Sequence, residues 1–293
     1  MNKRYKGVLC IIGAAFCFAT MNLFVSKAGD LPVFQKGLFR NLVAIIFASV
    51  ILIKNRKKEG MKVTKQNFPL LFLRSFAGTA GFLCNFYAVD HMNISDASML
   101  NKLAPFFVII FSAIFLKEKA KFYQWMAVVV AFVGSLFIIK PSFHLDFFPA
   151  VIGVLGGLGA GIAYTCVRKL GQGGTKGPLI VFFFSAFSCV VLGPITVLNY
   201  VPMTWQQFLF LIGAGLAASG GQFCVTAAYT FAPAKEISVY DYSQVLFAAL
   251  LGFFFLSQVP DLFSMIGYVI ICGIAIWMFL YTRRIEKKTA KQG

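Results

Sequence analysis

Two groups of polar side chains interrupt segments that are otherwise apolar enough to lie inside a membrane. They are Ser98, Asn101 and Lys102 in the first half of the chain and Ser238, Asp241 and Tyr242 in the second. An ionisable group in the middle of a membrane span costs about 2.5–3.5 kcal/mol, so it usually faces a cavity or a charged partner. A cation, a carboxylate, an amide and hydroxyl groups can together bind a charged or amphoteric small molecule. Ser98, Asn101, Lys102, Asp241 and Tyr242 are therefore the first candidates for substrate contact.

The two groups are related by an internal repeat. Each has i, i+3, i+4 spacing, which places its three members on one face of a helix. A shift of 140 positions lays the first group on the second, and residues 68–118 then align with residues 208–258 without a gap. Polar residues are rare inside membrane spans, so their recurrence at the same place indicates two related halves.

The elements that must position these residues are membrane spans. The 293 residues are 59% hydrophobic, with a mean hydropathy of +0.80, which is more apolar than soluble domains are. A helix needs about 20 mostly apolar residues to cross a bilayer. Spans are predicted at residues 7–28, 34–53, 68–89, 96–116, 122–139, 148–167, 178–198, 205–230, 236–256 and 262–281.

Five spans per half is an odd number, so the second half must enter the membrane from the opposite side. The predicted fold is an all-α membrane protein with ten transmembrane helices in two inverted five-helix repeats, residues 1–145 and 146–293. Secondary transporters that alternate access around a central site use this plan. Gly153, Gly157 and Gly161 recur at every fourth position of the sixth span, which predicts close packing against another helix.

The formal net charge of +17 reflects topology rather than a nucleic-acid partner. If both termini are cytoplasmic, most of the 27 lysines and arginines fall in cytoplasmic connections and tails, as the positive-inside rule requires. We expect an integral protein of a bacterial inner (cytoplasmic) membrane with both termini in the cytoplasm. Membrane lipids with anionic headgroups are the expected surface partners.

Lys102 and Asp241 have opposite charges, and a direct ion pair would neutralise both. On straight helices, however, Lys102 lies toward the outer end of its span and Asp241 toward the inner end, roughly 13 Å apart in depth at 1.5 Å per residue. We therefore expect each to line its own part of a cavity and to contact a different end of the substrate; local pairing or contacts with the backbone are the alternative. Asp241 is also the candidate carrier of a coupling proton, because desolvation favours protonation of a carboxylate.

Ionisable residues near the ends of spans can extend their charged groups to the membrane surface. We expect this of Arg168, and we expect Glu118 to form a surface ion pair with a neighbouring lysine of the segment KEKAK. Arg40 and Arg74 each lie about a turn and a half inside a span, roughly 9 Å from its start. For these two arginines a surface role and a cavity role are equally open.

Several segments resemble the EamA-type members of the drug/metabolite transporter superfamily. They are Arg40, Arg74, LAPFFVIIFSAIFLKEK from Leu103 to Lys119 and YQWMAVVVAFVG from Tyr123 to Gly134, with Pro105, Glu118, Gln124 and Gly134 as the positions that carry the likeness. The resemblance implies a secondary transporter for small organic metabolites with a cavity between its halves. The second half departs from the pattern, with Val245 where Pro105 maps and Gln258 where Glu118 maps.

Other classes of function find less support. An intramembrane aspartyl protease needs two carboxylates that share a proton, and VYDYS at 239–243 has no Gly-x-Gly-Asp partner; an ATP-driven pump needs a phosphate-binding loop, which is absent. A lipid-intermediate flippase of the same fold is the main alternative. The expected partner is a small-molecule substrate, with no cofactor, no metal and no nucleic acid, and a homodimer is left open.

Overall fold

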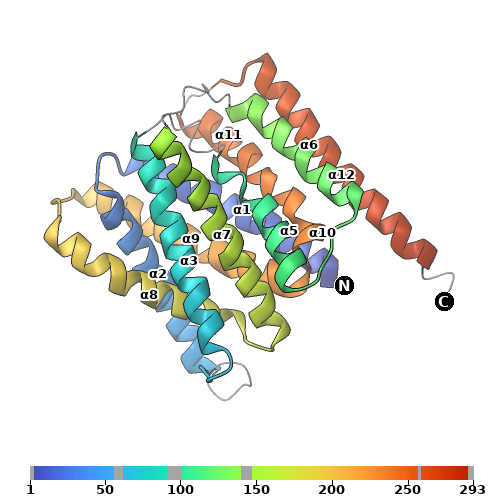
Figure 1. Cartoon of the computed structure of the whole chain (residues 1–293). Coiled ribbons are helices and arrows are strands. Elements are labelled where there is room, and N and C mark those ends of the chain that lie inside the picture. The colour runs from blue at the N-terminus through green and yellow to red at the C-terminus, as the bar shows by residue number, and fades with distance from the viewer. Residues whose placement is uncertain (1–2, 56–61, 92–99, 140–146, 257–258, 290–293) are drawn as a thin grey trace.

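The computed structural model describes residues 3–55, 62–91, 100–139, 147–256 and 259–289, and within these ranges the regular structure is helical, without a β-strand. Figure 1 shows the arrangement. The helices are α1 (Lys3–Lys27), α2 (Val33–Lys54), α3 (Phe68–His91), α5 (Ala104–Phe115), α6 (Phe122–Ile139), α7 (Phe147–Gln172), α8 (Gly177–Leu198), α9 (Trp205–Phe231), α10 (Ala234–Ile237), the 3₁₀ helix η1 (Ser238–Tyr242), α11 (Ser243–Leu256) and α12 (Leu262–Thr289).

The helices confirm the predicted all-α membrane fold. Eight of them, with α10, η1 and α11 counted as one, are long and apolar enough to cross a membrane. The 24-residue α3 and the shorter apolar α5 complete the ten predicted spans. Most of their bounds lie within a few residues of the predicted ones, because a run of apolar residues marks a span. The predicted fourth span starts at residue 96, outside the described residues, and α12 extends to Thr289, beyond the predicted end at residue 281. The boundary predicted between residues 145 and 146 lies outside the described residues, so it stays a prediction.

Equivalent helices of the two halves make equivalent contacts. The first span of each half packs along the third span of the other, as α1 on α9 and as α3 on α7. The second spans α2 and α8 pack on each other, and the fifth spans α6 and α12 do the same, side by side in Figure 1. This pattern is the one that a pseudo-two-fold axis between two inverted repeats produces. Both termini lie on the same side of the bundle.

The fourth and ninth spans are interrupted at the positions of the two polar groups. Lys102 and Leu103 form a turn, and α5 begins at Ala104 with Pro105 in its first turn, where a proline needs no hydrogen-bonded N–H. In the second half the interruption is η1, which separates α10 from α11. Irregular backbone at membrane depth is tolerated where it is buried in protein or lines a cavity.

Glycines allow the helices that surround the interruptions to approach closely. A Cβ on Gly161 would lie 2.5 Å from Cβ of Phe107, and a Cβ on Gly157 would lie 3.1 Å from the carbonyl oxygen of Leu100. The predicted packing face of the sixth span therefore contacts the fourth span. Another face of α7 contacts α3, where a Cβ on Gly159 would lie 2.7 Å from the carbonyl oxygen of Ala77. These contacts fix α7 between the two spans that carry cavity residues.

Candidate functional site

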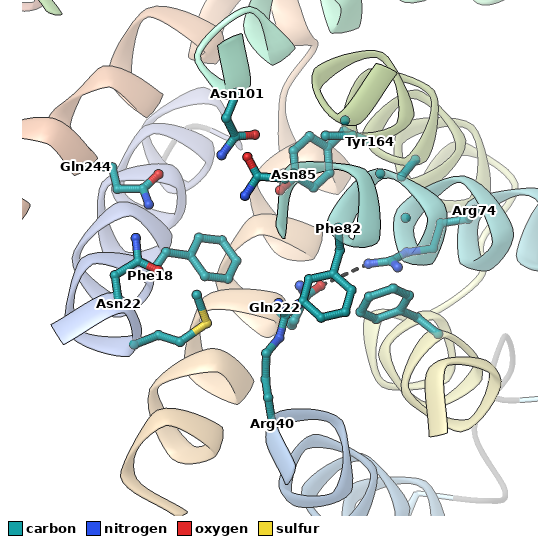
Figure 2. Close-up of a pocket in the computed structure, with 17 residues that line it drawn as sticks. Phe18, Asn22, Arg40, Arg74, Phe82, Asn85, Asn101, Tyr164, Gln222 and Gln244 are labelled. Atoms are coloured by element: carbon teal, nitrogen blue, oxygen red, sulfur yellow. Dashed lines mark hydrogen bonds between the residues drawn. The ribbon is translucent and has the colours of Figure 1, made fainter. Parts of the chain in front are cut away.

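A cavity of about 180 Å³ lies between the two halves. Side chains of α1, α2, α3, α7, α8, α9 and α11 line it together with Asn101, so both repeats contribute. Most lining residues lie in the middle of their helices or toward the side opposite to the termini; Figure 2 shows the lining. The lining residue Asn22 lies near the end of α1 and is exposed, so we take the cavity to open on the side opposite to the termini.

Arg74 of α3 is buried at the wall of this cavity. Only 2% of it is exposed, and its Nη2 donates a hydrogen bond of 2.9 Å to Oε1 of Gln222 on α9. The guanidinium carbon lies 3.8 Å from the ring centre of Phe184 on α8, a distance at which a cation is attracted to the face of the ring. The sequence left a surface role open for Arg74, and the structure places it in the cavity.

Arg40 of α2 lines the same cavity from another helix. Its guanidinium carbon lies 5.0 Å from the ring centre of Phe82 on α3, and only 9% of the residue is exposed. Figure 2 shows Arg40 and Arg74 approaching the cavity from different helices. No carboxylate belongs to the lining in the described part of the chain.

Four amide side chains occupy another part of the lining. They are Asn22, Asn85, Asn101 and Gln244, and Figure 2 shows them grouped away from Arg74. Amides can donate and accept hydrogen bonds without a net charge. This part of the cavity therefore suits an uncharged polar group, whereas the two arginines suit an oxyanion.

Lys102 and Asp241 form a direct pair beside the cavity. Lys102 Nζ lies 3.4 Å from Oδ2 of Asp241 and donates a hydrogen bond of 2.8 Å to Oε1 of Gln244. The expectation that the two charges stand roughly 13 Å apart at 1.5 Å per residue is wrong. It assumed two straight helices, whereas both spans are interrupted at these residues. Gln244 connects the pair to the cavity, because it is both a partner of Lys102 and a lining residue.

The remaining residues of the two polar groups have different environments. The hydroxyl of Tyr242, which is fully buried, donates a hydrogen bond of 3.0 Å to the backbone carbonyl of Lys102. Repeat-related positions 102 and 242 thus contact each other. Ser238 is also fully buried, and Ser98 lies outside the described residues. Of the seven predicted substrate contacts, the structure brings Asn101, Arg40 and Arg74 to the cavity lining, and their contact with a substrate stays a prediction.

Hydrogen-bonded side chains close the bundle on the side of the termini. Arg168 donates to Oε1 of Glu118 through Nε at 3.0 Å and Nη2 at 2.8 Å, and Gln172 donates to the same oxygen at 2.9 Å. Nη1 of Arg168 donates to the backbone carbonyls of Tyr229 and Thr230. We call Glu118, Arg168 and Gln172 the Glu118 network; it joins the end of the fourth span to α7 and α9.

The Glu118 network corrects two expectations. Glu118 pairs with Arg168 rather than with a lysine of its own segment, and Arg168 turns inward rather than toward the membrane surface. On the cavity side of this network, the rings of Tyr164 and Tyr229 stack with centres 5.1 Å apart. Tyr164 lines the cavity, and Tyr229 is buried. Tyr164 lies four residues before Arg168 on α7, and the Tyr229 carbonyl accepts from Arg168, so the stacked pair lies between the cavity and the Glu118 network.

Sequence reasoning missed several of the lining amides. Asn22, Asn85, Gln222 and Gln244 lie inside predicted spans, and a search for every amide inside a span would have found them. The comparison of repeats did not, since Phe82 stands where Gln222 maps in the first half. Both of these repeat-related residues nevertheless line the cavity.

Comparisons with known proteins agree with this geometry. The profile of the EamA-like transporter family matches residues 5–140 and again residues 148–280. A crystal structure of a protein with 14% sequence identity superposes with a TM-score of 0.85 over 96% of this chain and 99% of that chain, which shows the shared fold.

Three relatives carry the names of transporters. The pseudopaline exporter CntI of Pseudomonas aeruginosa is 31% identical over 91% of this chain and 93% of its own length. The riboflavin transporter of Vibrio cholerae is 25% identical over 87% of this chain and 86% of its own. Solute carrier family 35 member G1 of Homo sapiens is 26% identical over 89% of this chain and 75% of its own. With both halves matched by one family profile, this chain is a membrane transporter that belongs to the EamA-like family of the drug/metabolite transporter superfamily.

Proposed function

We propose that the chain is a secondary active transporter that moves a small charged or amphoteric organic metabolite by alternating access. The observation that carries this proposal is a polar cavity between two inverted halves that both contribute to its lining. The Glu118 network joins the helices on the side of the termini. The cavity volume of about 180 Å³ is below the roughly 300–1,000 Å³ of pockets for drug-sized ligands. A small substrate fits this volume. It would be released when the protein opens on the side of the termini and closes on the opposite side.

The basic residues support one orientation of this transporter. Lysines and arginines concentrate in the connections on the side of the termini, so the positive-inside rule assigns that side to the cytoplasm of a bacterial inner membrane. In this orientation the Glu118 network closes the cytoplasmic side and the cavity extends toward the outside. A C-terminal fluorescent fusion should fluoresce in the cytoplasm, and a C-terminal alkaline phosphatase fusion should be inactive; the reverse pattern would contradict the orientation.

A proton is the proposed coupling ion, with Asp241 as its carrier. Among the described spans, Asp241 is the carboxylate that does not lie near the end of a span. It pairs with Lys102, and Lys102 donates a hydrogen bond to the lining residue Gln244. Uptake or efflux by proteoliposomes should depend on pH in the unaltered chain and lose this dependence in Asp241→Asn. An unchanged pH dependence in Asp241→Asn would refute the coupling role.

A flippase with a lateral opening receives less support from the cavity lining. An apolar groove of about 390 Å³ lies between α11 and α12, and the residues that line it include Leu246, Leu250 and Cys272. It shares no lining residue with the polar cavity. A headgroup site that is continuous with the bilayer would need such a connection, so the geometry favours a soluble metabolite.

Transport of metabolites by the purified chain tests the proposed function. Proteoliposomes would be loaded with a bacterial small-molecule extract, and mass spectrometry would record which compounds leave against an imposed pH or sodium gradient. We expect at least one small polar compound to cross roughly tenfold faster than in protein-free liposomes, and its accumulation to collapse when the gradient is dissipated. If no compound crosses faster than in protein-free liposomes, the proposed function is wrong.

A further inference from the structure

The polar cavity contains two buried cations without an acidic counterpart. Arg40 and Arg74 both contribute to its lining, and the lining residues that the structure describes include no aspartate or glutamate. Asp241, which lies beside the cavity, is paired with Lys102. Buried charges in proteins are normally paired, because removal of a charged group from water is costly. Among the described residues, the lining therefore supplies no negative charge that would balance the two arginines.

Arg74 has unused hydrogen-bond donors at the cavity wall. Its Nε and Nη1 are buried and have no hydrogen-bond partner in the described part of the chain, although Nη2 binds Gln222. A Cβ at position 78 would lie 3.0 Å from Nη1, so glycine at this lining position avoids a close contact with that nitrogen. A guanidinium in this state matches the fork of donors that binds a carboxylate or phosphate.

Aromatic rings hold both guanidinium groups in place. Phe184 lies against Arg74 and Phe82 against Arg40, at 3.8 and 5.0 Å from guanidinium carbon to ring centre. A ring face attracts a cation but accepts no strong hydrogen bond, so it orients the guanidinium and leaves its N–H edge for a ligand. Two like charges in one cavity repel each other, and an anion that binds both would remove this repulsion.

We propose that the cavity selects a soluble organic anion, whose carboxylate or phosphate group binds between Arg40 and Arg74. This inference rests on the proposed function and specifies its substrate class. The amides of Asn22, Asn85, Asn101 and Gln244, grouped away from Arg74 in Figure 2, bind the uncharged polar part of the same molecule. A bare inorganic anion would leave these amides unused, which is why the substrate is organic.

Paired ligands that differ only in charge test this inference. The full-length protein in detergent would be titrated with succinate, glutamate and glycerol 3-phosphate, and with the neutral counterparts succinamide, glutamine and glycerol. The anionic, neutral and cationic fractions of a bacterial small-molecule extract extend the search, and nanodiscs with phosphatidylglycerol test a lipid headgroup. Melting temperature and calorimetric affinity are the two measurements.

Four variants make the test specific to the cavity. They are Arg40→Gln, Arg74→Gln, Arg74→Lys, which keeps the charge but loses the fork of donors, and the control Arg283→Gln, which removes an exposed arginine at the end of α12. Size-exclusion chromatography and the melting temperature without ligand show which variants fold. If Arg74→Gln does not fold, Arg40→Gln and Arg74→Lys still answer the question.

We expect an anionic compound or the anionic fraction to raise the melting temperature, and its neutral counterpart to have no effect at the same concentration. Each folded cavity variant should bind at least tenfold more weakly, with Arg283→Gln unchanged. Stabilisation by neutral or cationic compounds only, by lipid only, by no fraction at all, or equal binding by the variants would overturn the inference. Proteoliposomes that transport neutral or cationic compounds would overturn it while leaving the proposed function intact; proteoliposomes that transport nothing would overturn the proposed function itself.

Discussion

The ion pair between Lys102 and Asp241 joins the two halves at the point where both of their spans are interrupted. Each charge was visible in the sequence as a polar residue within an apolar segment. Their contact was not, because depth along a straight helix says nothing about a turn or a 3₁₀ segment that shifts the side chain. The arginines of the cavity were likewise visible, but the choice between membrane surface and cavity depended on neighbours such as Phe184 and Gln222.

Removal of one charge from the pair should destabilise the protein more than removal of both. Lys102 is 9% and Asp241 22% exposed at the side chain, so Lys102→Met or Asp241→Asn leaves a largely buried charge alone, at a cost of about 3 kcal/mol. The double variant should lose clearly less than the sum of the two single losses. Melting temperatures in detergent measure this coupling, with Asp30→Asn in an exposed loop as the control; additive losses would show that the pair contributes nothing.

The hydrogen bond from Tyr242 to the backbone of Lys102 should stabilise the interruption of the fourth span. Its acceptor is a buried carbonyl at the turn before α5, and an unsatisfied buried polar group costs about 1–3 kcal/mol. Tyr242→Phe removes only the hydroxyl, so the melting temperature should fall by several degrees. Tyr200→Phe, at a residue that is 54% exposed, should leave it unchanged; equal behaviour of the two variants would contradict the assigned role.

At the scale of elements, hydropathy was sufficient to predict the ten spans, and the repeat was sufficient to predict their inversion. The interruptions were harder to predict. Pro105 signals the one in the first half, but the equivalent position in the second half is Val245, which gives no such signal. For the sixth span, helix packing was predicted for the glycine face with Gly153, Gly157 and Gly161. The contact between α3 and α7 depends on a second glycine face, with Gly156 and Gly159. These two glycines do not belong to the series spaced by four residues from which the first face was predicted.

The contact between α3 and α7 should depend on Gly159. A Cβ there would lie 2.7 Å from the carbonyl of Ala77 and 2.8 Å from Cα of Gly81, and backbone atoms cannot move aside without separating the helices. Gly159→Val should therefore lower the yield of monodisperse protein and its melting temperature strongly. Gly193→Val is the matched control, because a Cβ at Gly193 in α8 would meet nothing within 4 Å; if both variants behave alike, the close approach is not required.

For the whole molecule, the pseudo-two-fold arrangement explains how one cavity can be reached from two sides. The contacts of the two halves are equivalent, but the Glu118 network closes the side of the termini, and Gln258 stands where Glu118 maps in the second half. Two equivalent halves make two conformations of similar free energy feasible, and an asymmetric contact decides which one is populated. Loss of the Glu118 network should therefore shift the population toward the conformation that is open on the side of the termini.

Accessibility of single cysteines should report this shift. The assay uses a chain with its seven cysteines replaced by alanine. Asn22→Cys at the open end should react quickly with a membrane-impermeant maleimide. Ser238→Cys, which is fully buried toward the side of the termini, should react slowly.

Glu118→Gln removes the charge that binds Arg168 and so weakens the closure. It should slow the labelling of Asn22→Cys several-fold and speed that of Ser238→Cys in inverted vesicles. Lys117→Gln, an exposed neighbour, should change neither rate; unchanged rates in Glu118→Gln would show that the closure does not depend on this network.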